Sequence, residues 1–376
     1  MSGGGGVAVE VLEPGPAEDA QCRVAGALAA AGLGPGDRIA FCLPSSADLL
    51  VCVLGAARCG VVPVLINATL LPAEREALVA DADPAMTVRD AGGLGALLAG
   101  PRGAVARHPL VRPMHYTSGT TGRPKGVWSG VLDAEEAREQ FEDEADLWHF
   151  GASDTHLVCS PLYHSVSVRL AGSALLRGGR VVVLERFDAE VVLDVLERLR
   201  PTTTFMAPTA LHRVLARSEG RGCFDALRLL VHAGSPCPER LKRTALDRVP
   251  TGALWEFYGS TEGQFTVCGP EEWLERPGTV GRARPGRRLD VDDEGVVWCH
   301  APRFARFGYW RDPASTARAW RGDAFTVGDL GRVDDEGYLF LEGRRDDLVI
   351  SGGVNVYPVE VEAALAELPG VEEVAV

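Results

Sequence analysis

Residues 115–126 read His-Tyr-Thr-Ser-Gly-Thr-Thr-Gly-Arg-Pro-Lys-Gly, with three glycines, four Ser or Thr hydroxyls and one lysine. Glycines allow consecutive backbone N–H groups to converge on one point, and such a concavity binds anions. The hydroxyls add hydrogen-bond donors, and Lys125 adds a mobile positive charge for a phosphate. The stretch therefore predicts a phosphate-binding loop.

This loop is not the P-loop of common NTPases. That motif needs a glycine, four further residues and then Gly-Lys-Ser/Thr. Here Pro124 occupies the place of the second glycine after Gly119. A surface linker rich in Ser and Gly is the alternative interpretation, and the further motifs along the chain argue against it.

The composition limits the partners and the compartment. A chain of 376 residues with 46% hydrophobic content can bury a large core, in one domain or in two or three modules. Its net charge of −14 argues against a nucleic-acid or anionic-membrane partner. The nine cysteines form no Cys-x-x-Cys pair, which fits reduced thiols better than a disulfide framework or a zinc site.

The chain shows neither a secretory signal nor a membrane span. The first six residues, Met-Ser-Gly-Gly-Gly-Gly, lack a basic and an apolar region. The most apolar segment, residues 49–66, contains Arg58, Gly and Pro, and it predicts a buried helix followed by a strand. We expect a cytoplasmic protein that acts as a monomer or a homodimer.

Alternating strands and helices predict the fold class. Residues 36–66 predict one βαβ unit, with a strand at 39–43, a helix opened by Pro44-Ser45-Ser46 and ended by Gly60, and a strand at 61–66. Further strands are predicted at 156–160, 180–184, 203–207 and 227–233, and further helices at 166–176, 189–198, 210–217 and 239–246. This order predicts a large layered α/β domain with parallel strands and argues against a solenoid.

The pattern changes toward the C-terminus. Short strand-like runs at 296–300 and 338–342 predict a small β subdomain at about 285–343. The charged break at 343–347 predicts a boundary, so we expect one domain over 1–343 and a hinge with the start of a small α+β domain over 344–376. That part contains a predicted helix at 358–368 and ends in an apolar run at 371–376, so we expect the natural protein to continue.

One acidic segment needs a separate interpretation. Residues 133–148 are acidic, with apolar residues near helical spacing, and predict an amphipathic helix that packs through Phe141 and Leu147. A partner-binding helix is the alternative.

Four further motifs follow the loop in order. They are Pro-Leu-Tyr-His-Ser at 161–165, His-Ala-Gly-Ser-Pro at 232–236, Glu-Phe-Tyr-Gly-Ser-Thr-Glu-Gly at 256–263 and Val-Gly-Asp-Leu-Gly-Arg at 327–332. With the loop, they resemble the adenylate-forming superfamily, which includes acyl-CoA synthetases, firefly luciferase and peptide-synthetase adenylation domains. The resemblance runs from about Asp37 to the C-terminus and implies an N-terminal domain that binds AMP and an acyl group.

The resemblance implies roles around the phosphates of ATP. Thr261 contacts the α-phosphate, and Glu262 holds Mg²⁺, which needs few carboxylates because phosphate oxygens and water complete its shell. The loop residues that hold the β- and γ-phosphates are Thr117, Ser118, Gly119, Thr120, Thr121, Gly122 and Lys125.

It also implies an adenosine site. Gly234, Ser235 and Pro236 form a turn on which the adenine lies, although an ordinary strand-to-helix turn looks the same in sequence. Tyr258 packs on the adenine. Asp329 accepts hydrogen bonds from both ribose hydroxyls, and Arg344 is the next ribose contact.

The acyl and coenzyme A sites depend on the same resemblance. His164 lies beside the substrate carboxylate and gates the acyl pocket, whereas a lone histidine is more often a core residue. The small residues Gly234 and Gly259 indicate a roomy pocket. Asp346 is the hinge, and Gly352 leaves room for the pantetheine arm of coenzyme A.

The substrate is expected to be a carboxylic acid without an amino group. Peptide-synthetase domains carry a Phe-Asp-x-Ser element and a separate aspartate for the amino group. Here Phe187-Asp188 follows the histidine motif and reads as a helix N-cap. A hydrophobic acid is therefore expected over an amino acid.

The implied reaction has two steps. A carboxylate attacks the α-phosphorus of ATP to give acyl-AMP and pyrophosphate, and the coenzyme A thiolate then displaces AMP. The family's lysine near the far end of the C-terminal domain has no counterpart here, so we expect this polypeptide by itself to adenylate poorly or not at all.

Three alternatives stay open at this point. Val327 replaces the family's threonine, and Trp128 places an indole just after the loop, so an enzyme specialised for thioesterifying a supplied acyl-adenylate is one of them. An acyl-AMP ligase that loads a carrier protein in trans is another. The third is a nucleotide-binding sensor that does not release pyrophosphate.

Overall fold

The computed structural model describes residues 6–117, 124–344, 349–351 and 354–356, together with the single positions 361, 365, 368, 371 and 374. The chain falls into two compact units. Unit 1 contains residues Met1–Phe205 and Phe304–Pro313. Unit 2 contains residues Met206–Arg303 and Ala314–Val376.

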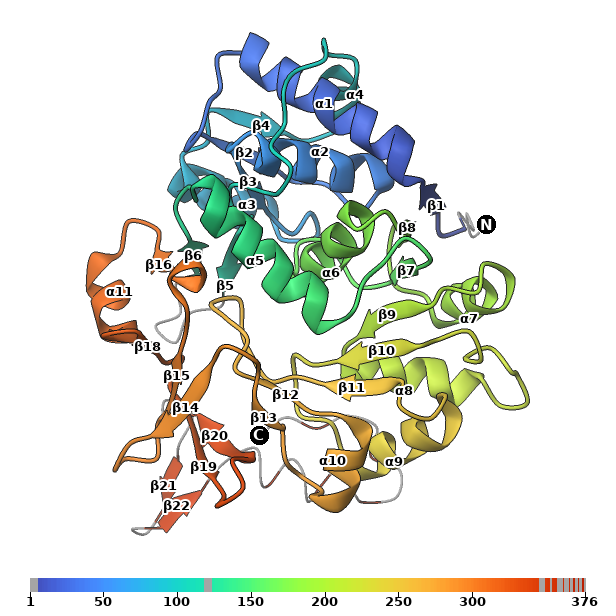
Figure 1. Ribbon diagram of the computed structural model, residues 1–376, viewed down its shortest axis with the longest axis vertical. Helices are drawn as coiled ribbons and strands as arrows, with labels where there is room; N and C mark the ends of the chain where they lie inside the picture. Colours follow the sequence, from blue (N-terminus) through green and yellow to red (C-terminus); the bar gives the residue numbers. More distant parts are fainter. Residues whose placement is uncertain are drawn as a thin grey trace. The chain divides into compact units, whose positions relative to one another are not determined.

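Unit 1 is a layered arrangement of strands and helices (Figure 1). Its strands are β1 (Val9–Leu12), β2 (Arg38–Phe41), β3 (Val62–Leu65), β4 (Met86–Val88), β5 (Met114–Thr117), β6 (Lys125–Trp128), β7 (Thr155–Val158), β8 (Arg180–Leu184), β9 (Thr203–Met206) and β16 (Gly308–Tyr309). Its helices are α1 (Pro14–Ala30), α2 (Ala47–Arg58), α3 (Pro72–Ala82), α4 (Ala91–Leu98), α5 (Ala134–Leu147), α6 (Ser165–Leu176) and α7 (Ala189–Arg198).

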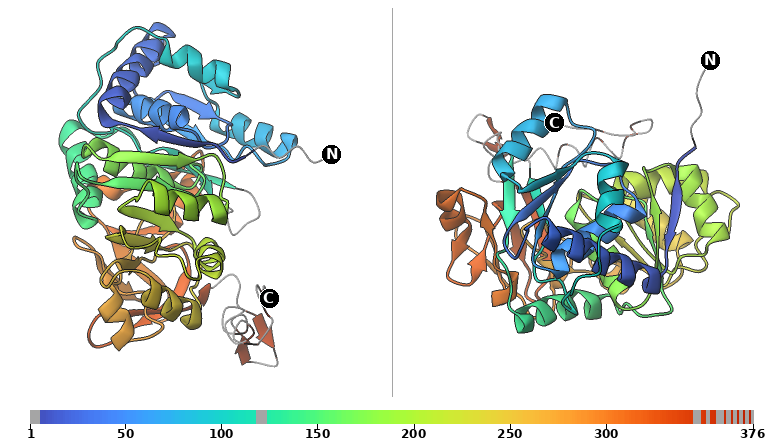
Figure 2. Two further views of the ribbon diagram at one scale, coloured as in Figure 1. Left: turned by 90° about the vertical axis from the view of Figure 1, so that its right-hand side faces the viewer. Right: turned by 90° about the horizontal axis from the view of Figure 1, so that it is seen from above.

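The predicted βαβ unit forms the centre of one sheet. The sheet has the order β16-β6-β5-β3-β2-β4, and β3 runs parallel to β2. Helix α2 connects these two strands, and Ser46 caps its N-terminus by accepting a hydrogen bond from the Leu49 N–H at 3.1 Å. Helices α1 and α4 lie side by side and both contact α2, as the views in Figure 2 also show for α1 and α4. The prediction for residues 36–66 is confirmed.

Arg58 is the charged residue that interrupts the most apolar segment of the sequence. Its guanidinium turns inward at the end of α2, donates to the Ala106 carbonyl at 2.7 Å and reaches Gln21 and Glu18, both at 2.9 Å. These hydrogen bonds and the ion pair with Glu18 offset the cost of burying this charge. In the part of the chain that the structure describes, no helix is long and apolar enough to cross a membrane.

The second sheet of unit 1 carries the other predicted elements. Strands β8 and β9 run parallel to β7 on either side of it, and β1 joins β8 antiparallel. Asp188 caps α7 by accepting from the N–H groups of Glu190 and Val191, which confirms the predicted N-cap. Helix α5 packs through the buried ring of Phe141, in agreement with the predicted amphipathic helix.

Unit 2 begins with alternating elements and continues with short antiparallel strands. In chain order it contains α8 (Pro208–Arg217), β10 (Leu229–His232), α9 (Glu239–Arg248), β11 (Leu254–Glu256), β12 (Thr266–Val267), α10 (Pro270–Glu275), β13 (Arg282–Ala283), β14 (Arg288–Val291), β15 (Val297–His300), α11 (Pro313–Ala319), β17 (Trp320–Arg321), β18 (Ala324–Phe325), β19 (Asp329–Val333), β20 (Leu339–Arg344), β21 (Val349–Ser351) and β22 (Val354–Val356). A short 3₁₀ turn covers Arg303–Ala305.

Two features of unit 2 place its functional residues. Helix α9 crosses over between the parallel neighbours β10 and β11. The antiparallel sheet β14-β15-β18-β17 and the hairpin β19-β20 form the β-rich region that the sequence predicted after residue 285.

One segment inside this region belongs to unit 1. Strand β16 pairs antiparallel with β6, and Trp310 follows it. The Trp310 indole N–H donates to the Asp81 carbonyl at 3.0 Å. The Arg38 guanidinium lies 4.4 Å from the Trp310 ring centroid, and the Trp128 ring packs edge-on against Trp310 at 5.5 Å between centroids. The sequence did not predict this return, because the two paired strands are far apart along the chain.

We expect Trp310 to anchor the segment 304–313. Replacing Trp310 by alanine should lower the free energy of unfolding by about 3 kcal/mol, because a large packed ring is lost. Replacing it by phenylalanine should cost only about 1 kcal/mol, since this change keeps a ring and removes one hydrogen bond. Urea unfolding measures both values, and equal stability of the alanine variant and the wild type would contradict the anchoring role.

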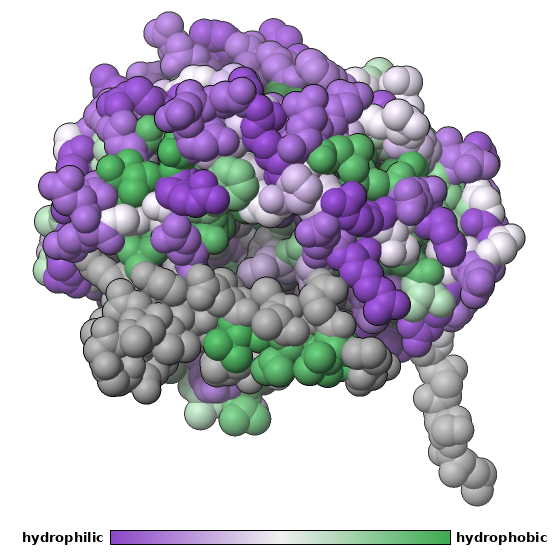
Figure 3. Space-filling view, turned by 90° about the horizontal axis from the view of Figure 1, so that it is seen from below, coloured by the Kyte–Doolittle hydropathy of each residue, from purple (hydrophilic) through white to green (hydrophobic). Residues whose placement is uncertain are grey.

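Several predictions fall on residues that the structure does not describe as a whole. The helix at 358–368, the apolar run at 371–376 and the domain boundary at 343–344 stay predictions. None of the nine cysteines, all of which lie in the described residues, forms a disulfide. On the face seen in Figure 3, hydrophilic residues predominate among the described residues, and hydrophobic ones form small separate groups.

Candidate active site

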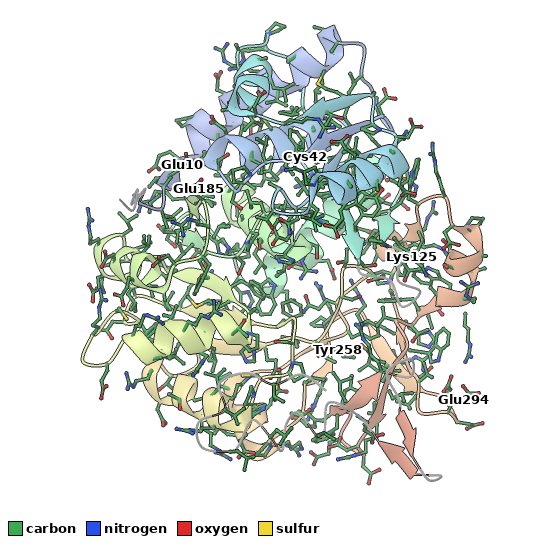
Figure 4. The ribbon with its side chains drawn as sticks, turned by 180° about the vertical axis from the view of Figure 1, so that it is seen from behind. Glu10, Cys42, Lys125, Glu185, Tyr258 and Glu294 are labelled. Carbon is green, nitrogen blue, oxygen red and sulfur yellow. The ribbon has the colours of Figure 1, made fainter. Side chains whose placement is uncertain are left out.

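The ends of the predicted phosphate loop lie in unit 1, on two neighbouring strands. Thr117 ends β5, Lys125 begins β6, and the two residues are paired across this antiparallel ladder. The Lys125 ammonium lies 5.2 Å from the ring centroid of Tyr309 on β16, within cation–π range. Figure 4 labels Lys125 at this position. The predicted loop residues that lie outside the described ones are Ser118, Gly119, Thr120, Thr121 and Gly122.

The histidine motif is connected to the phosphate loop by a residue that the sequence analysis did not single out. His115 on β5 is buried, and its Nδ1 lies 2.8 Å from the Tyr163 carbonyl. Burial lowers the pKa of His115 from 6.5 to about 4, so the ring is neutral and its Nδ1–H donates to that carbonyl. His164 follows directly, with its ring tilted against the Tyr163 ring at 4.5 Å between centroids and open to solvent. Desolvation by the surrounding protein lowers the pKa of His164 as well.

This geometry predicts a dependence of stability on pH. In the folded protein His115 stays neutral down to about pH 4. In the unfolded chain the same imidazole is protonated as the pH falls below 6.5, so acid favours the unfolded state. The stabilisation is complete above pH 6.5, and about 3 kcal/mol is lost as the pH falls to about 4.

The control is the His115→Asn variant, which keeps a donor for the Tyr163 carbonyl but does not titrate. The buried His232 shifts in the same direction, so the informative quantity is the difference between the two proteins. Urea unfolding at pH 7 and pH 5 should show a smaller loss for the variant. Equal losses would exclude His115 as the source.

In unit 2 the predicted adenine turn leaves the end of β10. Gly234 has φ of +96°, a left-handed conformation that favours glycine, and a Cβ there would meet no atom within 4 Å. Gly234, Ser235 and Pro236 are all exposed. Since β10 and β11 are parallel neighbours, this turn and the segment after β11 emerge at the same edge of the sheet.

The segment after β11 folds into a tight hairpin. The Ser260 N–H donates to the Gly263 carbonyl at 2.9 Å, which places Thr261 and the buried Glu262 at the tip. Gly259 is required for this approach, because a Cβ there would lie 2.7 Å from the Gly263 oxygen. The close backbone approach therefore gives Gly259 a steric reason besides the roomy pocket that the sequence suggested.

Three residues that were predicted to bind the nucleotide are joined at the Asp329 carboxylate. Asp329 at the start of β19 is buried, and its Oδ2 accepts from the Tyr258 hydroxyl at 2.5 Å. Its Oδ1 accepts from Arg344 Nε at 2.8 Å, across the β19-β20 pair. Burial raises the pKa of Tyr258 well above its ordinary value, and the Asp329 charge adds to this, so the phenol remains a donor. Figure 4 also labels Tyr258.

The structure describes the surroundings of both residues that depart from the family pattern, Val327 and Trp128. Thr326, next to Val327, carries a hydroxyl that accepts from the Gly328 N–H at 3.0 Å. Trp128 packs against Trp310 and the core of unit 1, so its indole has a structural role where β16 pairs with β6.

The carboxylate side chains of the candidate site could hold Mg²⁺ only if the phosphates of a bound substrate supplied further ligands. No group of three or more His, Cys, Asp or Glu side chains that could hold a metal is found among the described residues. A single carboxylate, that of Glu262 at the hairpin tip, fits a cation that binds mainly to phosphate oxygens and water.

The structure thus groups some predicted residues and leaves others out. Tyr258, Asp329 and Arg344 are joined by hydrogen bonds, and Thr261 and Glu262 lie on the hairpin that follows Tyr258. Asp346 and Gly352 lie outside the described residues. The roles of all predicted site residues stay predictions at this point.

The family model described as "AMP-binding enzyme" matches residues 17–107 and 106–298, so the chain belongs to the AMP-binding enzyme family. The indoleacetate–CoA ligase of Aromatoleum aromaticum is 32% identical over 94% of this chain and 78% of its own length. The resemblance to the adenylate-forming superfamily is confirmed.

Solved structures agree in fold. The o-succinylbenzoate-CoA synthetase of Bacillus subtilis, in complex with its acyl-adenylate intermediate, superposes with a TM-score of 0.83 at 25% identity and covers 96% of this chain and 78% of its own. That synthetase has also been solved with ATP and a magnesium ion. An amide bond synthetase from Marinactinospora thermotolerans has a TM-score of 0.82 at 26% identity, over 95% of this chain and 79% of its own. The predicted α/β class is confirmed.

Proposed function

We propose that this protein is an acid:CoA ligase that activates a hydrophobic carboxylic acid as its acyl adenylate and transfers the acyl group to coenzyme A. The observation that carries the proposal is the shared carboxylate of Asp329, which draws Tyr258 and Arg344 together. Such an arrangement is rigid and polar, as a site for a ribose and its base needs to be. The relationship to CoA ligases supports the same reaction.

In the first step, a carboxylate oxygen of the acid attacks the α-phosphorus of ATP, and the bond to pyrophosphate breaks. Two anions meet, so charge neutralisation and alignment are the main requirements. Thr117, Lys125 and the loop between them bind the β- and γ-phosphates. Thr261 orients the α-phosphate, and Glu262 holds Mg²⁺, which neutralises phosphate charge when bound.

In the second step, the thiolate of coenzyme A attacks the acyl carbon, and AMP leaves. His164 is assigned to the acid, and the exposure of its ring next to Tyr163 supports this assignment. Asp346 acts as the hinge between a domain over 1–343 and a small C-terminal domain. Gly352 faces the pantetheine arm after that movement.

Coenzyme A is proposed as the acceptor because the curated relative above is a CoA ligase. The amide bond synthetase among the structural neighbours shows that other acceptors must be included in the test. We also propose a cytoplasmic monomer or homodimer, in keeping with nine cysteines that form no disulfide. Light scattering after gel filtration distinguishes the two states.

The decisive experiment offers a panel of aromatic, alicyclic and fatty acids to the full-length protein with ATP, Mg²⁺ and coenzyme A. We expect AMP, pyrophosphate and a CoA thioester in equal amounts for at least one acid. Thioester formation only from supplied acyl-AMP would identify the half-reaction enzyme, and transfer only to a phosphopantetheinyl carrier would identify a loading ligase. Binding of ATP without pyrophosphate release for every acid would overturn the proposal.

A further inference from the structure

The chain contains only two lysines among its 38 Lys and Arg residues. One is Lys125 at the phosphate loop, and the other is Lys242 on α9. Lys242 is 1% exposed and belongs to the largest fully buried side chains. A buried ammonium destabilises the fold unless it is paired. The chain uses arginine at nearly every other basic position, and a lysine supplies a more compact charge than arginine.

Two buried acceptors meet this charge. Lys242 Nζ lies 2.8 Å from Glu256 Oε2 and 2.5 Å from His232 Nε2. His232 is 0% exposed and Glu256 is 7% exposed. These contacts form one cluster, which we call the Lys242 cluster and define as His232, Lys242 and Glu256.

The protonation states follow from burial. Burial lowers the pKa of His232 well below 6.5, and the charge of Lys242 lowers it further, so the ring is neutral. Its Nε2 accepts from Lys242, which leaves the proton on Nδ1, an atom without a hydrogen-bond partner in the described part of the chain. Burial raises the pKa of Glu256, and Lys242 opposes that rise.

Two thiols and one aromatic ring also lie around the Lys242 cluster. Burial raises the pKa of Cys237 and of Cys268 to about 12, so both thiols are neutral. The ring of Trp273 on α10 lies 5.5 Å from the ammonium. The Lys242 ammonium thus contacts one imidazole and one carboxylate, with neutral thiols beside them.

The cluster lies at the end of two strands. His232 is the last residue of β10, Glu256 is the last residue of β11, and the two are register partners. Directly after Glu256, the Phe257 N–H donates to the His232 carbonyl at 3.3 Å. The adenine turn at 233–236 leaves the first strand, and Tyr258 lies two residues beyond the second.

We propose that Lys242 is a positioning residue for the nucleotide, which acts through His232 and Glu256 on the spacing between the turn at 233–236 and Tyr258. This role rests on the proposed function, since it concerns the same adenosine site. A buried ion pair is often no more stabilising than apolar residues of similar volume. What the ion pair of Lys242 and Glu256 contributes instead is a fixed distance between the ends of β10 and β11.

The test separates geometry from stability. The variants are Lys242→Met, the double variant Lys242→Met with Glu256→Gln, and Lys242→Arg, which retains the charge. Arg243→Met is the matched control, since Arg243 is the next residue on α9 and is exposed. AMP affinity is measured by calorimetry, and the melting temperature is measured in parallel.

We expect the double variant to melt within a few degrees of the wild type but to bind AMP about tenfold more weakly. The KM for ATP should rise while the KM for the acid is unchanged. Lys242→Arg should recover part of the affinity, and Arg243→Met should behave as the wild type.

Three results would overturn the proposal. One is wild-type AMP affinity in a folded double variant. The second, which applies if the double variant does not fold, is wild-type AMP affinity in Lys242→Met. The third is an equal rise in the KM of every substrate, which would indicate a general structural role of Lys242. A wild-type protein that fails to bind AMP would instead contradict the proposed function itself.

Discussion

Replacing Asp329 by asparagine is expected to lower kcat/KM for ATP by about a hundredfold, through the loss of hydrogen bonds to a charged group. Both carboxylate oxygens are occupied, Oδ2 by the Tyr258 hydroxyl and Oδ1 by Arg344. An amide can accept at only one of these two positions, and its NH₂ group then faces a donor. The proposed ribose hydroxyls also lose a charged acceptor.

Steady-state kinetics with ATP as the varied substrate, together with AMP binding, measure this effect. Tyr258→Phe is the graded control, because it removes one donor and leaves the charge of Asp329, and we expect about a tenfold loss. The melting temperature of each variant shows whether the fold is retained. An Asp329→Asn protein that is folded and binds AMP like the wild type would show that Asp329 is only a structural hub for β19 and β20.

Replacing Glu262 by glutamine is expected to reduce ATP–pyrophosphate exchange by about a thousandfold, or about 4 kcal/mol of activation free energy. Glu262 is buried at the tip of the hairpin at 259–264, and glutamine preserves its shape while removing the charge that would hold Mg²⁺. Because the second step involves no pyrophosphate, thioester formation from supplied acyl-AMP should fall less than tenfold.

The matched control is Glu271→Gln, an exposed acid in the first turn of α10 in the same unit. It should exchange pyrophosphate like the wild type. Equal losses of Glu262→Gln in both half-reactions would mean that Glu262 supports the hairpin and not the metal. Raising the Mg²⁺ concentration should recover part of the exchange rate if the metal site is merely weakened.

Much of the fold follows from local sequence patterns. The βαβ unit at 36–66 was predictable because its strands are buried on both faces and Ser46 caps its helix. The N-cap at Asp188 and the helix through Phe141 follow from short-range rules of the same kind. The hairpin that carries Thr261 and Glu262 could be located in the sequence only through the family motif around it.

Non-local pairings could not be predicted in this way. Strand β16 joins β6 and brings Tyr309 to Lys125, although the two residues are 184 positions apart (309 − 125) in the sequence. His115 was visible as the first residue of the loop, but its bond to the Tyr163 carbonyl depends on how β5 and the histidine motif meet. No local spacing rule links such residues.

The sequence by itself determined the family, the α/β class and the residues that carry the motifs, because these depend on the order of residue types along short stretches. Only the tertiary structure decided that Tyr258 and Arg344 share the carboxylate of Asp329, and that Lys242 joins the ends of β10 and β11. The physical reason is that a buried charge is stable only beside its partners, and its partners are chosen by packing in three dimensions.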